Sequence, residues 1–196
     1  MIARRFVPAF ISAAVAALLL AGCAAPGAPA PADASPSAAD LLAEHDLDGL
    51  DARGVVDRLD ALPVAERPVD LIASVRPDRV ELSDQDGRTA SLPLPDDAFY
   101  ASIAPYAERT HECFFHSLTT CLGELPNAEV RVIVTDADGT VVLDEVRTTN
   151  DNGFVGLWLP RGIRGTITVE RDGLRASEPF ATDADSPTCL TTLQLS

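Results

Sequence analysis

Glu129-Val130-Arg131-Val132-Ile133-Val134 alternates polar and apolar side chains over most of its length. A period of two places the apolar residues on one face, so the stretch predicts a half-buried β-strand. The turn sequence Asp136-Ala137-Asp138-Gly139 follows almost directly, and Thr140–Arg147 then runs back as a second apolar segment. We therefore expect an antiparallel hairpin in the C-terminal half of the chain.

The same pattern continues to the C-terminus. Asn150-Asp151-Asn152-Gly153 is another turn signal. Further strands are predicted at Phe154–Leu159, Thr166–Glu170, Leu174–Phe180 and Leu190–Leu195. Short strands at this spacing are typical of a small β-sandwich, and we assign residues 109–196 to a C-terminal β domain.

The preceding part of the chain mixes helical and strand patterns. The predicted elements are helices within Leu41–Leu62, a strand at Val69–Val75, a hairpin of Arg79–Leu82 and Thr89–Leu92, and a partly helical segment at Asp97–Ala107. Asp51 is the expected N-cap of the second helix, and Asp86-Gly87 the expected turn of the hairpin. Residues 41–108 thus predict a smaller N-terminal αβ domain, and the fold class is α+β with an antiparallel, β-sandwich-like C-terminal domain.

The first residues predict export. Arg4 and Arg5 precede the apolar run Phe6–Leu20, and Leu20-Ala21-Gly22-Cys23 has the form of a lipobox, the cleavage and acylation signal of bacterial lipoproteins. The apolar run is shorter than the roughly 20 residues of a transmembrane helix. We therefore interpret residues 1–22 as a lipoprotein signal peptide rather than a retained anchor. Cys23 is then the lipidated first residue, anchored on the extracytoplasmic face of the bacterial cell membrane.

Residues 23–40 are rich in Ala and Pro and have almost no large side chains. Such a stretch cannot bury enough apolar surface to order itself, so we expect it to act as a tether.

The charge of the chain excludes several partners. The formal net charge is −15, no lysine is present, and removal of Arg4 and Arg5 makes the charge more negative. Nucleic acid and anionic lipid surfaces are therefore poor partners. The sequence also has no G-x-S-x-G nucleophile elbow and no glycine-rich phosphate loop.

Three cysteines and two histidines are the strongest chemical signal. Cys113 and Cys121 lie in one short segment with His111 and His116, and Cys189 lies near the C-terminus. One disulfide cannot use three thiols. Thiolates favour copper(I), whereas three cysteines and one histidine would also suit zinc. A disulfide between Cys113 and Cys121 is a third interpretation, because exported domains often contain one.

Other metal sites fit less well. The only methionine is Met1, which is lost with the signal peptide, so a blue-copper centre with an axial methionine and a methionine-rich copper site are both excluded. The Asp-x-Asp-Gly sequences at residues 46–49 and 136–139 lack the full ligand set of a calcium loop. We interpret the second of them as a hairpin turn.

The segment His111-Glu112-Cys113-Phe114-Phe115-His116-Ser117-Leu118-Thr119-Thr120-Cys121-Leu122-Gly123-Glu124 closely resembles the signature of the CueP family of periplasmic copper-binding proteins. Asp48–Ala52, leading to Val55–Leu59, resembles the N-terminal helix of that family. The resemblance covers the chain from about Leu41 to the C-terminus. It implies copper binding and copper tolerance outside the cytoplasm, with Cys113, Cys121 and Cys189 as thiolate ligands. It also implies a smaller αβ part followed by a β domain that holds the site.

These observations predict a lipid-anchored extracytoplasmic copper-binding protein that sequesters copper or delivers it. His116 is the preferred nitrogen ligand and His111 the reserve. The expected partners are the metal ion, the membrane through the lipid anchor, a metal-recipient cuproprotein and a second copy of the chain as a homodimer. Two alternatives stay open: a thiol-based copper(II) reductase or thiol–disulfide protein, and a structural domain stabilised by zinc or a disulfide. We expect no enzymatic activity other than this copper reduction.

Overall fold

A computed structural model of the chain describes residues 38–196. The predicted signal peptide, Cys23 and most of the predicted tether lie outside these residues. None of the described helices is long and apolar enough to cross a membrane. The described elements are two short α-helices, one 3-10 turn and ten strands in three sheets.

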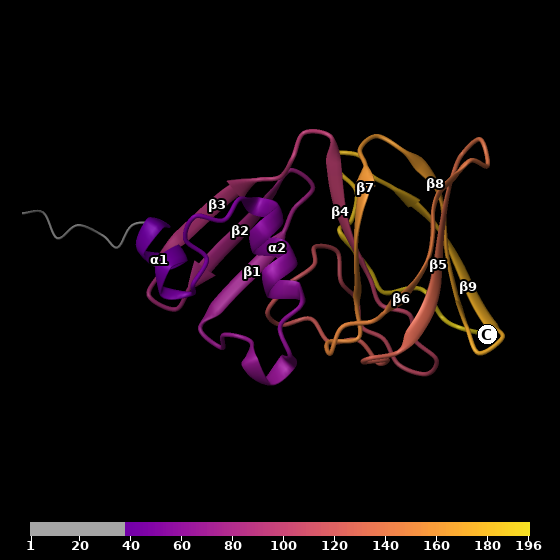
Figure 1. The fold of residues 1–196 in the computed structure, drawn as a ribbon, viewed down its shortest axis with the longest axis horizontal. Coiled ribbons are helices and arrows are strands. Elements are labelled where there is room, and N and C mark those ends of the chain that lie inside the picture. Colours follow the sequence, from indigo (N-terminus) through magenta and orange to yellow (C-terminus); the bar gives the residue numbers. More distant parts are fainter. Residues whose placement is uncertain (1–37) are drawn as a thin grey trace, which may run out of the picture. The chain divides into compact units, whose positions relative to one another are not determined.

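The N-terminal part consists of two helices and a three-stranded sheet (Figure 1). Its elements are α1 (Ala38–Glu44), α2 (Ala52–Asp60), the 3-10 turn η1 (Val64–Glu66), β1 (Leu71–Val75), β2 (Arg79–Asp84) and β3 (Thr89–Pro93). The strands pair antiparallel in the order β1-β2-β3. Asp51 caps α2 as predicted, because its carboxylate accepts the backbone N–H of Gly54 at 2.8 Å. α1 begins at Ala38, inside the range predicted as tether.

The apolar face of α2 explains how this layer holds together. Val55, Val56 and Leu59 recur at helical intervals and are buried, and they belong to one apolar cluster with the inward-facing residues of β1 and β2. That cluster also contains Tyr100 and Leu118 from later in the chain. The N-terminal layer therefore packs on the rest of the molecule rather than forming a closed core of its own.

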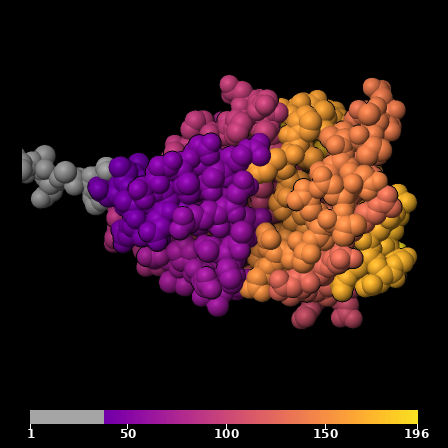
Figure 2. All heavy atoms as spheres, in the orientation of Figure 1, coloured from indigo at the N-terminus to yellow at the C-terminus, as the bar shows by residue number. Residues whose placement is uncertain are grey.

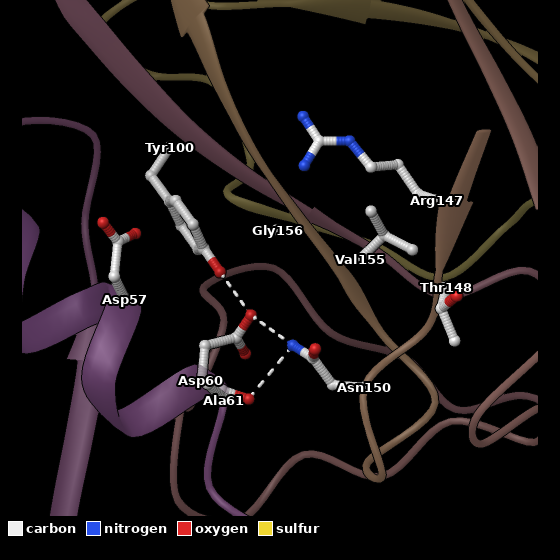
Figure 3. A pocket seen from close by; sticks show the side chains of 9 residues that line it. All are labelled: Asp57, Asp60, Ala61, Tyr100, Arg147, Thr148, Asn150, Val155 and Gly156. Atoms are coloured by element: carbon white, nitrogen blue, oxygen red, sulfur yellow. Dashed lines mark hydrogen bonds between the residues drawn. The ribbon is translucent and has the colours of Figure 1, made fainter. Parts of the chain in front are cut away.

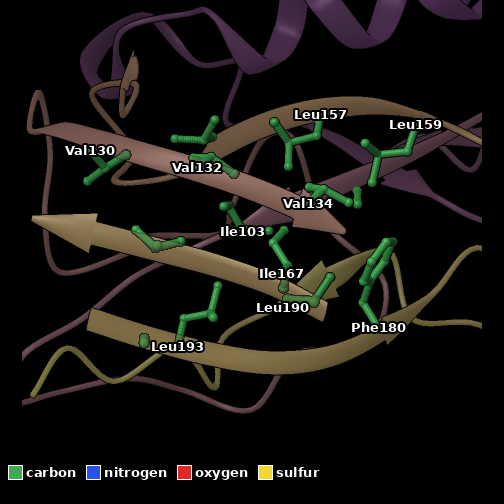
Figure 4. Close-up of a cluster of buried hydrophobic side chains, with 14 of the residues drawn as sticks. Ile103, Val130, Val132, Val134, Leu157, Leu159, Ile167, Phe180, Leu190 and Leu193 are labelled. Carbon is green, nitrogen blue, oxygen red and sulfur yellow. The ribbon is translucent and has the colours of Figure 1, made fainter. Parts of the chain in front are cut away.

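The C-terminal part is a sandwich of two sheets. One sheet has the order β10-β4-β7 and the other the order β6-β5-β8-β9. Its strands are β4 (Ala98–Ile103), β5 (Glu129–Asp136), β6 (Val141–Thr148), β7 (Val155–Pro160), β8 (Arg164–Arg171), β9 (Leu174–Ala181) and β10 (Cys189–Leu190). Their inner faces meet in one buried apolar cluster (Figure 4). This arrangement confirms the predicted β-sandwich and the α+β fold class.

Two predicted elements are wrong. Asp97–Ala107 is not partly helical, because Ala98–Ile103 forms β4. All six residues of β4 are buried, so the strand shows no alternation that would reveal it in the sequence. Leu190–Leu195 is not one strand either: Cys189–Leu190 pairs parallel with β4, and further along only Gln194 forms an isolated bridge, with Tyr106. β4 precedes the domain boundary predicted at residue 109, yet it pairs with β7 of the sandwich.

The layer formed by β4 and β7 has apolar contacts on both faces. Phe99, Ala101 and Ile103 point into the sandwich core. Tyr100 joins the cluster of the N-terminal layer, and Trp158 of β7 packs against it. Figure 2 shows the atoms of the N-terminal layer, indigo to purple, in direct contact with those of the C-terminal strands. Side chains near this contact can therefore be held from both sides.

Candidate metal centre

The loop between β4 and β5 carries four of the five predicted ligands, and backbone hydrogen bonds fix its path. The N–H of Val75 donates to the carbonyl of His116 at 2.8 Å, and the N–H of Leu118 donates to the carbonyl of Ala73 at 2.8 Å. Residues 116–118 thus extend the free edge of β1. Because β1 belongs to the N-terminal sheet, that sheet positions the histidine.

Cys189 reaches the same loop through β10. The N–H groups of Thr188 and Cys189 both donate to the carbonyl of Phe114, at 2.9 and 3.2 Å. The hydroxyl of Thr188 accepts the N–H of His116 at 3.0 Å and donates to the carbonyl of Val75 at 2.7 Å. These bonds bring the last strand beside the loop, although the two are distant in sequence.

The sulfur and nitrogen atoms form two overlapping groups. His111, Cys113 and Cys121 form one, His116, Cys121 and Cys189 the other, and the ligand atoms within each group lie within 4.8 Å of one another. The sulfurs of Cys113 and Cys121 are 3.7 Å apart, and the sulfur of Cys189 lies 3.7 Å from Nδ1 of His116. Two sulfurs that bind one ion at about 2.3 Å lie at most about 4.6 Å apart, so these separations suit a shared ion.

The structure therefore brings all five predicted residues together, with Cys121 common to both groups. In the described part of the chain, no group within this limit contains both Cys113 and Cys189. All three cysteines are free thiols.

The predicted hairpin turn at Asp136 is confirmed, since its carboxylate accepts the N–H groups of residues 138 and 140 at 3.0 and 2.8 Å.

Exposure differs between the two groups. His116 is completely buried and Cys189 is 3 % exposed. Cys113 and Cys121 are half-buried, and His111 lies at the surface. Phe154, fully buried, packs against both histidines, with ring centroids 4.6 Å from that of His116 and 6.2 Å from that of His111. His116 and Cys189 thus lie behind apolar side chains, whereas His111 and Cys113 are accessible to solvent, and Cys121 belongs to both groups.

The pKa values of the three thiols differ, because the thiols interact with one another. The pKa of Cys121 is well below its ordinary value, because the thiols of Cys113 and Cys189 donate hydrogen bonds to its sulfur and His116 adds a further one. The hydrogen bond with Cys121 raises the pKa of Cys113 to about 12. The neighbouring thiols of Cys113 and Cys121 raise the pKa of Cys189. Cys121 is therefore the first of the three thiols to ionise, and an ion that binds a further thiol displaces its proton.

A buried acid contacts the histidine from the other side. Nε2 of His116 lies 3.3 Å from Oδ1 of Asp60, the last residue of α2. Burial alone would lower the pKa of His116, but the hydrogen bonds with Asp60 and Cys121 raise it. Burial alone would raise the pKa of Asp60, but the hydrogen bonds with His116 and Tyr100 lower it. The pair is thus stabilised in its charged form.

Asp60 was not among the residues predicted from the sequence. A signal was present, because Asp60 follows Val56 by four residues and so falls on the buried face of α2. A carboxylate on an apolar helix face needs partners, and this indicates a buried polar site. Its partners could not be named, since they come from distant segments.

Two further residues hold the loop. Nη1 of Arg67, which is 7 % exposed, donates to the carbonyl of Cys121 at 2.8 Å. The carboxylate of Glu124 accepts the N–H groups of Ala107, Glu108 and Arg109 at 2.7, 3.0 and 3.2 Å. These bonds, the one from Glu108 first, lower the pKa of Glu124. Arg67 therefore fixes the backbone at Cys121, and Glu124 fixes the segment that leads to His111.

Comparison with known proteins agrees with this centre. The family described as "Periplasmic copper-binding protein CueP" matches residues 54–194, which include all five cysteines and histidines of the centre. The chain belongs to the CueP family. This match confirms the predicted resemblance to the family, and it confirms the prediction of a periplasmic copper-binding protein.

A solved structure of the CueP family supports the same assignment. The crystal structure of S.CueP superposes with a TM-score of 0.76 at 43% sequence identity, over 81% of this chain and 96% of that one. No curated protein matches the chain. At this identity the CueP fold, with its N-terminal layer and C-terminal sandwich, is shared.

Proposed function

We propose that this CueP family member is a lipid-anchored extracytoplasmic protein that binds copper(I) and either sequesters it or delivers it. Cys113, Cys121 and Cys189 are the thiolate ligands, His116 is the nitrogen ligand and His111 the reserve. The observation that carries the proposal is the position of the Cys121 sulfur, which lies within 4.8 Å of the ligand atoms of both groups.

The donor set favours copper(I). Soft thiolates select this ion, and copper(I) is satisfied by two or three ligands, which each group supplies. Structural zinc prefers four ligands in a tetrahedral arrangement. Burial also protects the Cys189 thiol from oxidation outside the cytoplasm. Zinc stays an alternative that the titration below distinguishes.

The difference in exposure supports exchange of copper with a partner. His111 and Cys113 lie where another protein's ligands can reach the ion, whereas Cys189 and His116 do not. An ion can pass between the two groups without leaving Cys121, because each transfer replaces one ligand at a time. A metal-recipient cuproprotein fits this arrangement, and a homodimer is retained as a prediction.

An anaerobic titration tests the proposal. The reduced mature chain carrying Cys23→Ser is titrated with copper(I) against a chromogenic chelator, beside Cys113→Ser, Cys121→Ser and Cys189→Ser. We expect one equivalent to be held tightly, with the greatest loss of affinity in Cys121→Ser. His116→Asn should weaken binding more than His111→Asn, and His45→Asn, the third histidine, serves as the control. Weak binding that survives Cys189→Ser would exclude the site, and tighter binding of zinc would favour a structural role.

The lipid anchor rests on the Leu20-Ala21-Gly22-Cys23 sequence. Cell fractionation of the wild-type chain and of Cys23→Ala tests it. We expect the wild-type protein in the membrane fraction and the variant outside it. Equal distribution of both forms would contradict lipidation.

Copper(II) reduction is the second candidate, and the 3.7 Å separation of the half-buried Cys113 and Cys121 sulfurs favours it. Formation of one disulfide releases two electrons and two protons, and two copper(II) ions each take up one electron. Two copper(I) ions formed per two thiols lost would support this reaction. Formation of copper(I) without loss of thiols would exclude it.

A further inference from the structure

Asp60 is a buried carboxylate enclosed by hydrogen-bond donors, with only 4 % of its surface exposed. The Tyr100 hydroxyl and Nδ2 of Asn150 donate to its Oδ2 at 2.7 and 3.0 Å (Figure 3). Nδ2 of Asn152 donates to its Oδ1 at 3.4 Å, and Nε2 of His116 lies 3.3 Å from the same oxygen. Three donor groups point at the two oxygens and favour the ionised carboxylate, which accepts in every contact.

This arrangement decides which nitrogen carries the proton when the His116 ring is neutral. A carboxylate can only accept, so the hydrogen between Asp60 and His116 belongs to Nε2. Nδ1 then faces the opposite way, 3.7 Å from the sulfur of Cys189. A half-turn of the ring about its Cβ–Cγ bond would put ring carbons in the places of Nε2 and Nδ1, so the contacts with Asp60 and Cys189 hold the ring in this orientation.

We propose that Asp60 is a positioning residue of the metal centre: it holds the His116 ring through Nε2–H and thereby presents Nδ1 to copper. This inference rests on the proposed function, in which His116 is a ligand. A histidine that binds a metal usually donates its other ring N–H to such a partner, which fixes its tautomer and raises its basicity. The partner here comes from the N-terminal layer, so α2 contributes to a site that otherwise lies in the loop and the sandwich.

The variant Asp60→Asn tests this role with almost no change of shape. Its amide oxygen is expected at the Oδ2 position, because two short donor contacts converge there. The amide nitrogen then faces Nε2 of His116 as a donor, and the proton of the neutral ring moves to Nδ1. A carboxylate-to-amide change beside a histidine imposes the wrong tautomer in the same way in serine proteases.

Asp57→Asn is the matched control. Asp57 lies one turn earlier on α2 and lines the same pocket of about 200 Å³ as Asp60 (Figure 3). Its carboxylate accepts Nε1 of Trp158 at 2.7 Å. The two substitutions therefore remove the same charge from the same helix, but only Asp60→Asn changes the partner of His116.

The first measurement is a long-range proton–nitrogen NMR correlation of the reduced, copper-free mature chain carrying Cys23→Ser, at a pH where the His116 ring is neutral. We expect the proton on Nε2 in this chain and in Asp57→Asn, and on Nδ1 in Asp60→Asn. Copper(I) should then shift the Nδ1 resonance and leave Nε2 protonated. A proton on Nδ1 without the Asp60 substitution, or copper(I) bound at Nε2, would overturn the assignment even if Asp60→Asn failed to fold.

The second measurement is the copper(I) affinity of the same three chains. A lost partner of a metal-binding histidine costs roughly ten- to hundredfold in affinity, which is the loss expected for Asp60→Asn. Asp57→Asn should stay within threefold. Equal losses of copper(I) affinity in both variants would indicate a general effect of the removed charge and would refute the role of Asp60 in positioning His116. If the chain without either substitution does not bind copper(I), the proposed function fails, while the copper-free NMR spectrum still decides the tautomer.

Discussion

Phe154→Ala should destabilise the protein strongly. Phe154 is completely buried and belongs to a small cluster with Ala104 and Cys189, separate from the two main cores. Its ring also lies against that of His116, at 4.6 Å between centroids. Ala104 directly follows β4, Cys189 lies in β10, and His116 lies in a loop held by backbone bonds, so these neighbours cannot collapse into the space that is left. Substitutions of this kind cost about 3–5 kcal/mol.

Urea denaturation followed by the fluorescence of Trp158, the only tryptophan, measures this loss. Thermal denaturation should show the same loss. For a protein of this size a loss of 1 kcal/mol lowers the melting temperature by roughly 2–4 °C, so we expect the melting temperature of Phe154→Ala to fall by roughly 6–20 °C. Phe154→Leu is the matched control and should cost less than about 1.5 kcal/mol, because most of the volume is retained. The slope of the free energy of unfolding against urea should not change.

A second readout links the same residue to the metal centre. Phe154 covers Cys189, so in Phe154→Ala this thiol should react faster with an alkylating reagent. The half-buried Cys113 provides the internal reference, because its thiol is already partly exposed in the unsubstituted chain. A loss below about 1 kcal/mol together with unchanged reactivity of Cys189 would refute the role of Phe154 as the wall of the centre.

Three further substitutions test other parts of the structure. In Gly156→Ala the new methyl group would overlap the Tyr100 hydroxyl, so we expect a cost of about 1–3 kcal/mol in urea denaturation and a shift of the ring signals of Tyr100 in NMR spectra. Asp51→Ala removes the cap of α2 and should cost about 1 kcal/mol, whereas Asp51→Asn should retain most of it. Glu124→Gln should speed hydrogen exchange of the amides of residues 107–109. Because the pKa of Glu124 is lowered in the folded state, its stabilisation is complete above its unfolded pKa and is lost as the pH falls through the folded value. The wild-type amides should therefore lose protection in acid, and those of Glu124→Gln should change little.

Elements with one buried face could be predicted, and elements buried on both faces could not. The α2 helix, β2 and β5 each bury side chains at regular intervals, and their periodicity is visible in the sequence. β4 is buried throughout because it lies between two apolar clusters, so its pattern carries no period. β10 forms only because β4 offers it an edge, and no local preference specifies that pairing.

The sequence by itself determined the chemistry of the centre. Thiol and imidazole groups in one short segment, with a third cysteine far along the chain, were enough to indicate a soft metal ion and the CueP family. Only the tertiary structure decided how these groups are arranged: Cys121 shared between two groups, His116 and Cys189 inside, and Asp60 behind the histidine. The physical reason is that donor types are properties of single residues, whereas distance, burial and the partner of a buried charge depend on segments that meet only when the two layers pack.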